Sequence, residues 1–384
     1  MRKLIKKKKI VFVTGTRADY GKLKSIIKIM QNSKKFTPIL YITGMHNLKS
    51  YGSTYTEIEK DKIKNRFRYP NQIPGDGMDI IVSKTIVGFS KFAKKIVPDL
   101  IVIHGDRIEP LACAIVGSLN NILVAHIEGG EVSGTIDEIL RHSISKLSHI
   151  HFVSNLKAKK RLIQMGELAK NIYIIGSPDI DLMLSQAIPK FSEVKKRYKI
   201  NFNKYGIVLF HPIVTTYKKN ENKENSEILV NAINKSRFNY VVIHPNNDRG
   251  SDIIIKSYSK LKHKKNIKLF PSLRFEYFLT LLKNSNFIIG NSSAGIREAP
   301  YYGTPTINLG NRQHKRSSSR NIFNLDFDAK KIHKLINQLT KSKIKMKKIK
   351  EFGYGNSNKK FIKIISKKNF WETSNQKYFK DYNK

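Results

Sequence analysis

The sequence predicts two doubly wound α/β domains, each built on a parallel sheet with helices on both faces. The first observation is that short apolar runs alternate with helix-like segments, in two successive series. The second is the content of the runs, since continuous Val and Ile stretches that end in Gly or polar residues are typical of buried parallel strands. The third is length, because 384 residues exceed one ordinary hydrophobic core.

The first series defines an N-terminal domain, which we place at residues 1–180. Its helix-like segments include GKLKSIIKIMQN, SKTIVGFSKFAKKI and LACAIVGSL. Its predicted strands, together with the turns that end them, are residues 10–15, 38–44, 99–106, 122–130, 149–155 and 172–179.

The second series defines a C-terminal domain, which we place at residues 181–360, with the break near 178–200. Residues 361–384 hold the only tryptophan, Trp371, within the aromatic-rich FWETSNQKYF. Aromatic side chains usually pack on something, so we expect a C-terminal helix there that packs back on the N-terminal domain. The predicted strands of this series are residues 206–212, 240–248, 267–271, 287–293 and 304–310.

Composition limits the class of protein. The formal net charge of +43 would suit nucleic-acid or membrane-surface binding. However, Lys is spread through nearly every segment and no nucleic-acid-binding module is recognisable, so we expect no nucleic-acid partner. No apolar stretch approaches the roughly 20 residues of a membrane helix, and the run IVFV is too short for a signal peptide. We therefore expect a cytoplasmic protein without membrane insertion, in which the single cysteine, Cys113, is buried.

A cluster of acids in residues 104–146 indicates proton-transfer chemistry. The chain has 72 Lys+Arg against 29 Asp+Glu, so acids gathered behind two short apolar runs need an explanation. Carboxylates beside Gly turns at strand ends can act as acids and bases on a sugar. The acids are Asp106, Glu109, Glu128, Glu131, Asp137 and Glu138.

The last two acids also have a simpler interpretation. Asp137 and Arg141 are spaced i,i+4 on a predicted helix, as are Glu138 and His142. Such pairs can be surface contacts of about 0.3–0.5 kcal/mol each. Surface pairing does not explain the neighbouring acids of the cluster, so both the surface and the catalytic interpretation are kept for these two acids.

The turn GTRADYG, after the first predicted strand, is suited to binding an anion. Gly15 permits a tight turn, the helix N-terminus offers free N–H groups, and Arg17 adds a planar fork for phosphate or carboxylate. Arg17 could instead pair with Asp19 or with a neighbouring helix. The turn matches neither a GxGxxG fingerprint nor a Walker A loop, so nicotinamide and ATP lack support and we expect no cofactor.

The segment GNSSAGIREAP forms a second strand-to-helix turn. Ser292, Ser293 and Gly295 would bring hydroxyl and backbone donors to a helix start, where they could cradle a diphosphate. Glu298 would be repelled by phosphate and would instead accept hydrogen bonds from sugar hydroxyls, such as those of a ribose. Ordinary N-capping by Ser, with Glu298 complementing the helix dipole, is the alternative.

Two histidines, His211 and His244, each end a predicted strand and precede a proline. A lone His is more often structural, but two at equivalent strand ends suggest ligand contacts. Asn246, in the segment that follows His244, is a further candidate. The sequence has no HExxH or CxxC pairing, so no metal is expected.

These motifs, in this order, closely resemble those of the hydrolysing UDP-N-acetylglucosamine 2-epimerases that start bacterial sialic acid synthesis. The similarity runs from about residue 10 to 310 and continues more weakly to the end. The resemblance implies two Rossmann-like domains of the GT-B type, an active site in the interdomain cleft, a homodimer, and no metal or nicotinamide. The matching segments are TGTRADYGKLKS, IHGDRIEPLA, HIEGGEVSGTIDEILRHSISKLSHIH, IIGSPDID, FHPIVTT, PSLRFEYFLTLLK and GNSSAGIREAPYYGTP.

The resemblance also implies a reaction, in which UDP-N-acetylglucosamine and water give N-acetylmannosamine and UDP through 2-acetamidoglucal. By motif position, Asp106, Glu131 and Asp137 match the catalytic acids of the family, and Glu128 aligns with an acid of non-hydrolysing relatives. The implied substrate contacts are Arg17, His211, Ser292 and Ser293 at the diphosphate, Glu298 at the ribose, and Arg141, His244, Asn246 and Gly295 nearby.

Several alternatives stay open. The non-hydrolysing epimerases carry GTRPE, HVEAGLR and a GHRRE-like segment, whereas this chain has GTRADYG, HIEGGEVSG and FHPIVT and so sides with the hydrolysing branch. Within that branch, some members act on UDP- or GDP-linked N,N'-diacetylbacillosamine, in the pathway to legionaminic acid. A GT-B glycosyltransferase is a candidate of another class, and a nucleic-acid-binding protein is a candidate motivated by charge alone.

Overall fold

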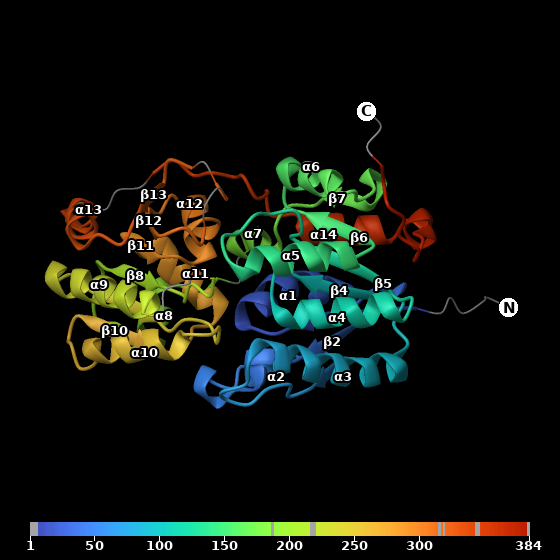
Figure 1. Cartoon of the computed structure of the whole chain (residues 1–384), viewed down its shortest axis with the longest axis horizontal. Helices are drawn as coiled ribbons and strands as arrows, with labels where there is room; N and C mark the ends of the chain where they lie inside the picture. Colours follow the sequence, from blue (N-terminus) through green and yellow to red (C-terminus); the bar gives the residue numbers. More distant parts are fainter. Residues whose placement is uncertain are drawn as a thin grey trace. The chain divides into compact units, whose positions relative to one another are not determined.

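The computed structural model describes residues 7–185, 188–215, 220–313, 316–317, 319–341 and 346–381. The chain divides into two compact units (Figure 1). The N-terminal unit comprises Met1–Glu131, Asp137–Leu184 and Glu351–Lys384, and the C-terminal unit comprises Val132–Ile136 and Ser185–Lys350.

The N-terminal unit has a 7-stranded sheet in the order β3-β2-β1-β4-β5-β6-β7, and each described strand pair is parallel. The order reverses between β1 and β4, and ligands of doubly wound folds bind beyond the strand ends at such a switch point. The strands are β1 (Lys8–Thr14), β2 (Phe36–Ile42), β3 (Arg66–Arg68), β4 (Leu100–His104), β5 (Leu123–Ile127), β6 (Ile150–Val153) and β7 (Ile172–Ile174). The helices are α1 (Arg17–Gln31), α2 (Tyr55–Lys60), α3 (Met78–Ile96), α4 (Ile108–Leu119), α5 (Ile136–Leu147), α6 (Leu156–Gln164), α7 (Pro178–Met183) and α14 (Ser357–Ile365).

Both faces of this sheet are buried, as the continuous apolar runs predict. Successive side chains of a strand point to opposite faces. Ile10 and Phe12 of β1 therefore pack with α1 and α14, whereas Val11 and Val13 pack with α3, α4 and α5. Cys113 of α4 lies in the second core and is 0% exposed, which confirms the prediction that it is buried.

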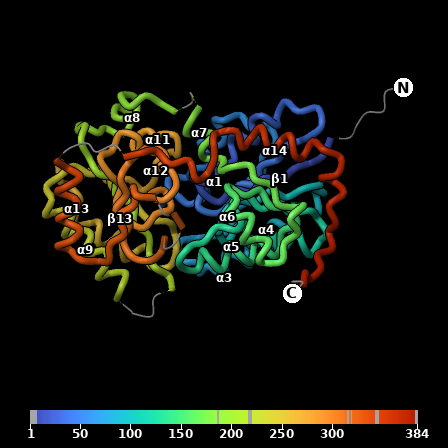
Figure 2. Tube along the Cα trace, turned by 90° about the horizontal axis from the view of Figure 1, so that it is seen from above, coloured from blue at the N-terminus to red at the C-terminus, as the bar shows by residue number. Residues whose placement is uncertain are grey.

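The C-terminal segment of the chain lies against the N-terminal unit, of which it is a part (Figure 2). The ring of Phe361 on α14 is 4.6 Å from that of Phe152 and 6.2 Å from that of Phe12. The indole of Trp371, in the 3-10 turn Lys368–Glu372, stacks on Phe36 with 6.2 Å between ring centres.

The C-terminal unit has a 6-stranded sheet in the order β10-β9-β8-β11-β12-β13, again with parallel pairs. Its order reverses between β8 and β11, and α9, α10 and α13 share one core on one face. The strands are β8 (Gly206–Leu209), β9 (Tyr240–Ile243), β10 (Ile267–Phe270), β11 (Phe287–Gly290), β12 (Thr306–Leu309) and β13 (Ile322–Leu325). The helices are α8 (Phe191–Tyr198), α9 (Glu221–Ser236), α10 (Ser251–Tyr258), α11 (Phe275–Asn284), α12 (Glu298–Tyr302) and α13 (Ala329–Lys341).

Every strand that the sequence predicts is present, and two short edge strands, β3 and β13, were not predicted. Among the described residues, none of the helices combines the length and apolar character needed to cross a membrane.

Candidate active site

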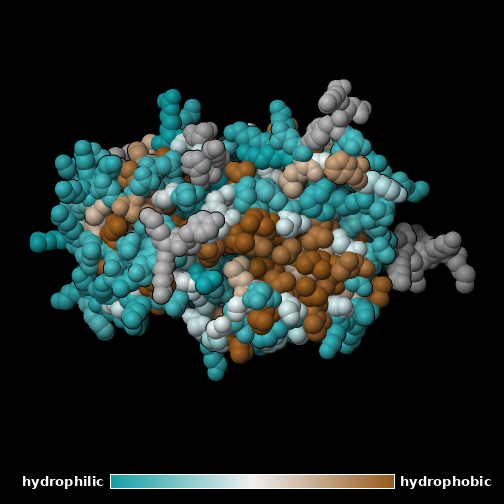
Figure 3. All heavy atoms as spheres, viewed as in Figure 1, coloured by the Kyte–Doolittle hydropathy of each residue, from teal (hydrophilic) through white to brown (hydrophobic). Residues whose placement is uncertain are grey.

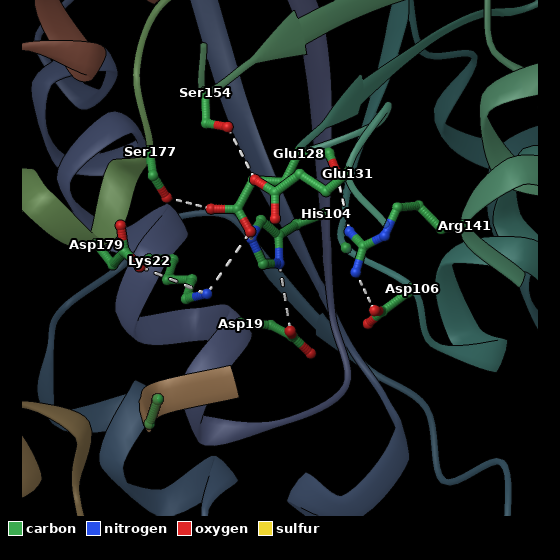
Figure 4. A network of polar contacts seen from close by, with 12 residues as sticks. Asp19, Lys22, His104, Asp106, Glu128, Glu131, Arg141, Ser154, Ser177 and Asp179 are labelled. Carbon is green, nitrogen blue, oxygen red and sulfur yellow. Dashed lines mark hydrogen bonds and ion pairs between the residues drawn. The ribbon is translucent and has the colours of Figure 1, made fainter. Parts of the chain in front are cut away.

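The acid cluster of the sequence gathers at the carboxyl ends of β4 and β5, beside the start of α1 (Figure 4). Gly105 has φ of +78° directly after β4, a conformation that Gly adopts without the steric cost of a Cβ. Its N–H donates to the carbonyl of Ile127 at 3.0 Å. The turn is therefore tied to β5, and Asp106 follows it at the strand end.

The buried guanidinium of Arg141 lies at the centre of the cluster. Its side chain, on α5, donates to the carboxylate of Asp106 and, at 2.9 Å, to the backbone carbonyl of Glu128. Burial alone would lower the pKa of Arg141, but the charges of Asp106, Glu131, Glu128 and Asp137 raise it above its ordinary value. One permanent cation thus interacts with the charges of all four predicted catalytic acids.

Glu131 and Asp137, two of these acids, lie in different surroundings. Glu131 is 4% exposed and accepts a hydrogen bond of 2.8 Å from the hydroxyl of Ser154, which follows β6. Asp137 lies in the first turn of α5 and is half-buried. Of the two predicted helix pairs, Glu138 and His142 are in contact at 2.9 Å, whereas the guanidinium of Arg141 reaches across to Asp106. This arrangement favours a supporting role for Arg141, and its direct contact with substrate stays a prediction.

Glu128 is held by groups that the sequence did not single out. The hydroxyl of Ser177 donates to its carboxylate, and the ammonium of Lys22 is 3.6 Å from its Oε2. Lys22 also lies 3.7 Å from Asp179, and both side chains are buried. Nε2 of His104 lies 3.0 Å from Oε2 of the same carboxylate. His104 ends β4 and Ser177 follows β7, so their place at a strand end is the signal that could have found them. Lys22 lies on α1 and Asp179 on α7.

The turn after β1 places Arg17 in contact with an acid of a neighbouring helix. Nη2 of Arg17 is 2.8 Å from Glu57 on α2, so the pairing with a neighbouring helix is the one observed, while Asp19 turns to Thr16 and His104. A Cβ at Gly15 would lie 3.0 Å from the carboxyl carbon of Glu109, so the turn packs closely on that fully buried acid.

In the C-terminal unit, His211 is fixed by neutral groups after β8. The side chain of Asn291 bonds both the N–H and the carbonyl of His211, at 2.7 and 2.9 Å. The backbone N–H of Asn246 donates to Nδ1 of His211 at 3.1 Å, which leaves the ring proton on Nε2. His211 and Asn246 are thus brought together. His244 ends its strand with its ring 6.4 Å from that of Tyr258, and burial together with the charge of Lys262 lowers its pKa.

The turn after β11 is compact. Gly290 has φ of +139°, and a Cβ there would lie 2.1 Å from the carbonyl of Leu209. The hydroxyl of Ser292 accepts a hydrogen bond of 3.3 Å from the N–H of Ala294 and so caps the 3-10 turn Ser293–Gly295.

The later residues of that turn are also buried. Gly295 packs on β12, since a Cβ would lie 2.6 Å from Cγ2 of Thr306. Glu298 begins α12 and is 3% exposed. Within the residues that the structure describes, no group of His, Cys, Asp and Glu side chains could hold a metal ion.

Comparison with known proteins gives a consistent picture. The family model described as UDP-N-acetylglucosamine 2-epimerase matches residues 28–366. A UDP-N-acetylglucosamine 2-epimerase of Neisseria meningitidis serogroup B is 44% identical over 379 residues, which cover 98% of this chain and 100% of that protein. A UDP-N,N'-diacetylbacillosamine 2-epimerase (hydrolyzing) of Legionella pneumophila is 33% identical over 327 residues, 83% of this chain and 85% of that one.

Solved structures share the fold. The UDP-GlcNAc 2-epimerase of Methanocaldococcus jannaschii, in complex with UDP-GlcNAc and UDP, superposes with a TM-score of 0.79 at 22% identity and covers 93% of this chain and 99% of its own. The structure from Neisseria meningitidis bound to UDP-GlcNAc gives 0.78 at 20% identity with the same coverage. The predicted fold class, two Rossmann-like α/β domains of the GT-B type, is confirmed. On the family model and the relatives together, the chain belongs to the UDP-N-acetylglucosamine 2-epimerase family.

Proposed function

We propose that the protein is a hydrolysing UDP-N-acetylglucosamine 2-epimerase, which converts UDP-N-acetylglucosamine and water to N-acetylmannosamine and UDP. The observation that carries the proposal is the gathering of Asp106, Glu128 and Glu131 around the buried Arg141 at the strand ends of one unit. The name of the Neisseria meningitidis relative, 44% identical, supports the substrate. The product would supply the synthesis of sialic acid, and a nucleotide-sugar substrate would place the enzyme in the cytoplasm.

The chemistry requires more than one carboxylate. The C2 proton is very weakly acidic in the ground state, but it becomes acidic as the C1–O bond breaks and the sugar gains oxocarbenium character. A carboxylate can then remove it while UDP leaves with the C1–O electron pair, which gives 2-acetamidoglucal. Hydration needs an acid to protonate C2 and a base to activate water, so two carboxyl groups must differ in protonation state. We assign Asp106, Glu131 and Asp137 to these steps jointly, with Glu128 as a fourth candidate.

The nucleotide contacts follow the two strand-to-helix turns. Arg17, His211 and the hydroxyls of Ser292 and Ser293 would bind the diphosphate and stabilise departing UDP. The Nε2–H of His211 supports this role, because its Nδ1 is already occupied by the N–H of Asn246. The remaining proposed contacts are Glu298 with the ribose, and His244, Asn246 and Gly295 beside the nucleotide.

The branch and the substrate are tested together by proton NMR of the purified protein in D2O with UDP-N-acetylglucosamine. Free UDP and N-acetylmannosamine deuterated at C2 are expected. UDP-N-acetylmannosamine without free UDP would overturn the hydrolysing assignment. If only the diacetylbacillosamine nucleotide is converted, the substrate belongs with the relatives named "(hydrolyzing)" from Legionella pneumophila and Campylobacter jejuni, 33% and 34% identical.

We also propose that the protein is a homodimer that associates through an apolar face of the N-terminal unit. Apolar side chains gather over α3, α4 and α5 (Figure 3), where Leu119 is 78% exposed. Helix α4 contains no Lys or Arg, in a chain that has 72 of them. Copies carrying +43 each repel one another, so the surface of α4, which lacks Lys and Arg, is where a second copy can approach, in a two-fold interface.

Sedimentation equilibrium tests the dimer. The native protein is expected to sediment as a dimer and Leu119→Glu as a monomer, because the variant buries two carboxylates at the two-fold contact. Leu156→Glu is the matched control and should stay dimeric, since Leu156 is 56% exposed but lies at the start of α6, which is not one of the three helices of this face. A monomeric native protein would overturn the proposal.

A further inference from the structure

Both ring nitrogens of His104 face carboxylate oxygens. His104 is the last residue of β4 and is 4% exposed. Its Nδ1 lies 3.4 Å from Oδ1 of Asp19, and its Nε2 lies 3.0 Å from Oε2 of Glu128 (Figure 4). The second contact is poorly aligned for a hydrogen bond and is an ion pair when the ring is protonated. A neutral imidazole donates from one nitrogen only, and ionised carboxylates only accept, so both contacts are favourable only for the doubly protonated ring.

We infer that His104 is a positioning residue whose imidazolium joins Asp19 and Glu128 into a buried charged triad, and so keeps Glu128 ionised and in place for the reaction. The catalytic meaning of the triad rests on the proposed function, whereas its existence does not. The triad connects the first turn of α1, beside the proposed diphosphate turn, with the proposed catalytic acids after β5.

The charges around the ring support this state. Burial alone would lower the pKa of His104, but the charge of Glu128 and the hydrogen bond to Asp19 outweigh it, as well as the opposing charge of Lys22, and raise the pKa to about 9. For Asp19 burial acts in the opposite sense, yet His104 and Arg107 hold its pKa below the ordinary value. The raised pKa of His104 and the lowered pKa of Asp19 both indicate that the pair is ionised at neutral pH.

Glu128 needs to be held, because its backbone is strained. Its φ is +67°, a left-handed conformation that residues with a Cβ rarely adopt. Among the described residues, Ser177 contacts its Oε1, and Lys22 and His104 contact its Oε2. Lys22 is shared between Glu128 and Asp179, whereas the ring of His104 contacts Glu128 and Asp19 in the first turn of α1.

A second buried histidine at the same edge of the sheet has a neutral ring, the opposite protonation state. His126 lies on β5 and is 0% exposed. Its Nε2 is 2.7 Å from the carbonyl of Gly105, to which it must donate, and its Nδ1 is 3.0 Å from the hydroxyl of Ser145, from which it can accept. One proton satisfies both contacts, and burial lowers the pKa of His126 to about 3 despite the bond to Gly105. His126 is therefore the matched control for His104.

The protonation state is read by nitrogen-15 NMR of the full-length protein labelled at histidine, with the His104 signals identified by their loss in His104→Gln. We expect His104 to be an imidazolium at pH 7 and to titrate near pH 9, and His126 to be neutral throughout. A neutral His104 ring at pH 7 would overturn the triad, whether or not the protein turns over a nucleotide sugar.

The positioning role is read from turnover. His104→Gln is expected to lower kcat about 10- to 100-fold, the effect of one charged hydrogen bond, with little change in KM. Wild-type activity should fall as pH rises through 9, when the ring loses its proton, and this alkaline limb should disappear in His104→Gln. His126→Gln should keep the limb, whatever its rate.

A second variant covers the case in which His104→Gln does not fold. Asp19→Asn removes the carboxylate whose hydrogen bond helps to raise the pKa of His104, so the alkaline limb should move to lower pH. An unchanged limb in Asp19→Asn, or native kcat in a folded His104→Gln, would overturn the inference. Absence of turnover by the wild-type protein with either nucleotide sugar would instead count against the proposed function.

Discussion

The strand ends of the two units hold their polar side chains in different ways. In the N-terminal unit, the carboxylates of Asp106 and Glu128 contact charged partners: Arg141 for the first, and Lys22 and His104 for the second. In the C-terminal unit, His211 is held by the amide of Asn291 and the N–H of Asn246, and Ser292 contacts the backbone of its own turn. The acids of the first edge are held by buried cations, whereas His211 and Ser292 at the second are oriented by neutral groups.

This difference fits a division between chemistry and binding. Carboxylates with unequal cationic partners can differ in protonation, which stepwise acid and base catalysis requires. A neutral imidazole or hydroxyl that already accepts one hydrogen bond still carries a proton to donate. Such a donor suits an anionic ligand, which brings its own charge. Variants in each unit can test this division.

The largest effect is expected at an acid of the N-terminal unit. Asp137→Asn should lower kcat by about 10²- to 10⁴-fold, the range of general acid–base catalysis, because an amide can neither take nor give the proton. Binding of UDP, measured by titration calorimetry, should change little. Loss of folding, or an equal loss of UDP affinity, would mean that Asp137 is structural or binds the nucleotide, and the division between the units would fail.

Arg141→Met tests whether the acids depend on a buried cation. The variant leaves Asp106 without its ion pair, and breaking a buried pair costs roughly 3–5 kcal/mol. The side chain of Asp106 is 24% exposed, so water compensates in part, and we expect a loss of about 2–3 kcal/mol in the free energy of unfolding in urea. The double variant with Asp106→Asn should recover part of the loss. A loss below about 0.5 kcal/mol would show an ordinary surface pair.

The fold was predictable from sequence to the extent that strands are apolar runs. Each predicted run became a strand, because a doubly wound sheet buries both faces of its interior strands. The edge strands β3 (Arg66–Arg68) and β13 (Ile322–Leu325) escaped prediction for the same reason. The residues of the first are exposed and those of the second largely half-buried, so neither needs an apolar run, and they form by pairing with β2 and β12.

The candidate site was predictable where residues stand close in sequence. The acids of 104–146 were found because acids are scarce in this chain and these are clustered. Lys22, Ser177 and Asp179 were missed as partners of Glu128, since only the order of β1, β5 and β7 in the sheet brings such distant segments together. His104 directly precedes the Gly–Asp turn, but nothing in the sequence states that its ring lies between two acids.

Glu298→Ala tests the binding side of the division. If Glu298 accepts hydrogen bonds from the ribose, its loss should weaken UDP binding by about 10- to 100-fold, the range for a hydrogen bond to a charged group. Saturating substrate should restore most of kcat, because the proposed contact is not at the reacting carbons. Unchanged affinity in calorimetry would remove Glu298 from the ribose site and leave it as the acid that opens α12.

The smallest effect is expected at Ser292, where capping and binding can be separated. Its oxygen accepts the N–H of Ala294, and a hydroxyl can still donate its own proton, which would go to a phosphate oxygen. Ser292→Ala removes both functions, so UDP affinity and the free energy of unfolding should each fall by about 0.5–1.5 kcal/mol. Ser292→Asp keeps a good capping acceptor but brings a negative charge to the proposed phosphate site. It should therefore retain stability and lose affinity more severely than the alanine variant. If Ser292→Asp binds UDP as well as the native protein, the hydroxyl is a cap alone, and the neutral donors of the C-terminal unit serve its own turns.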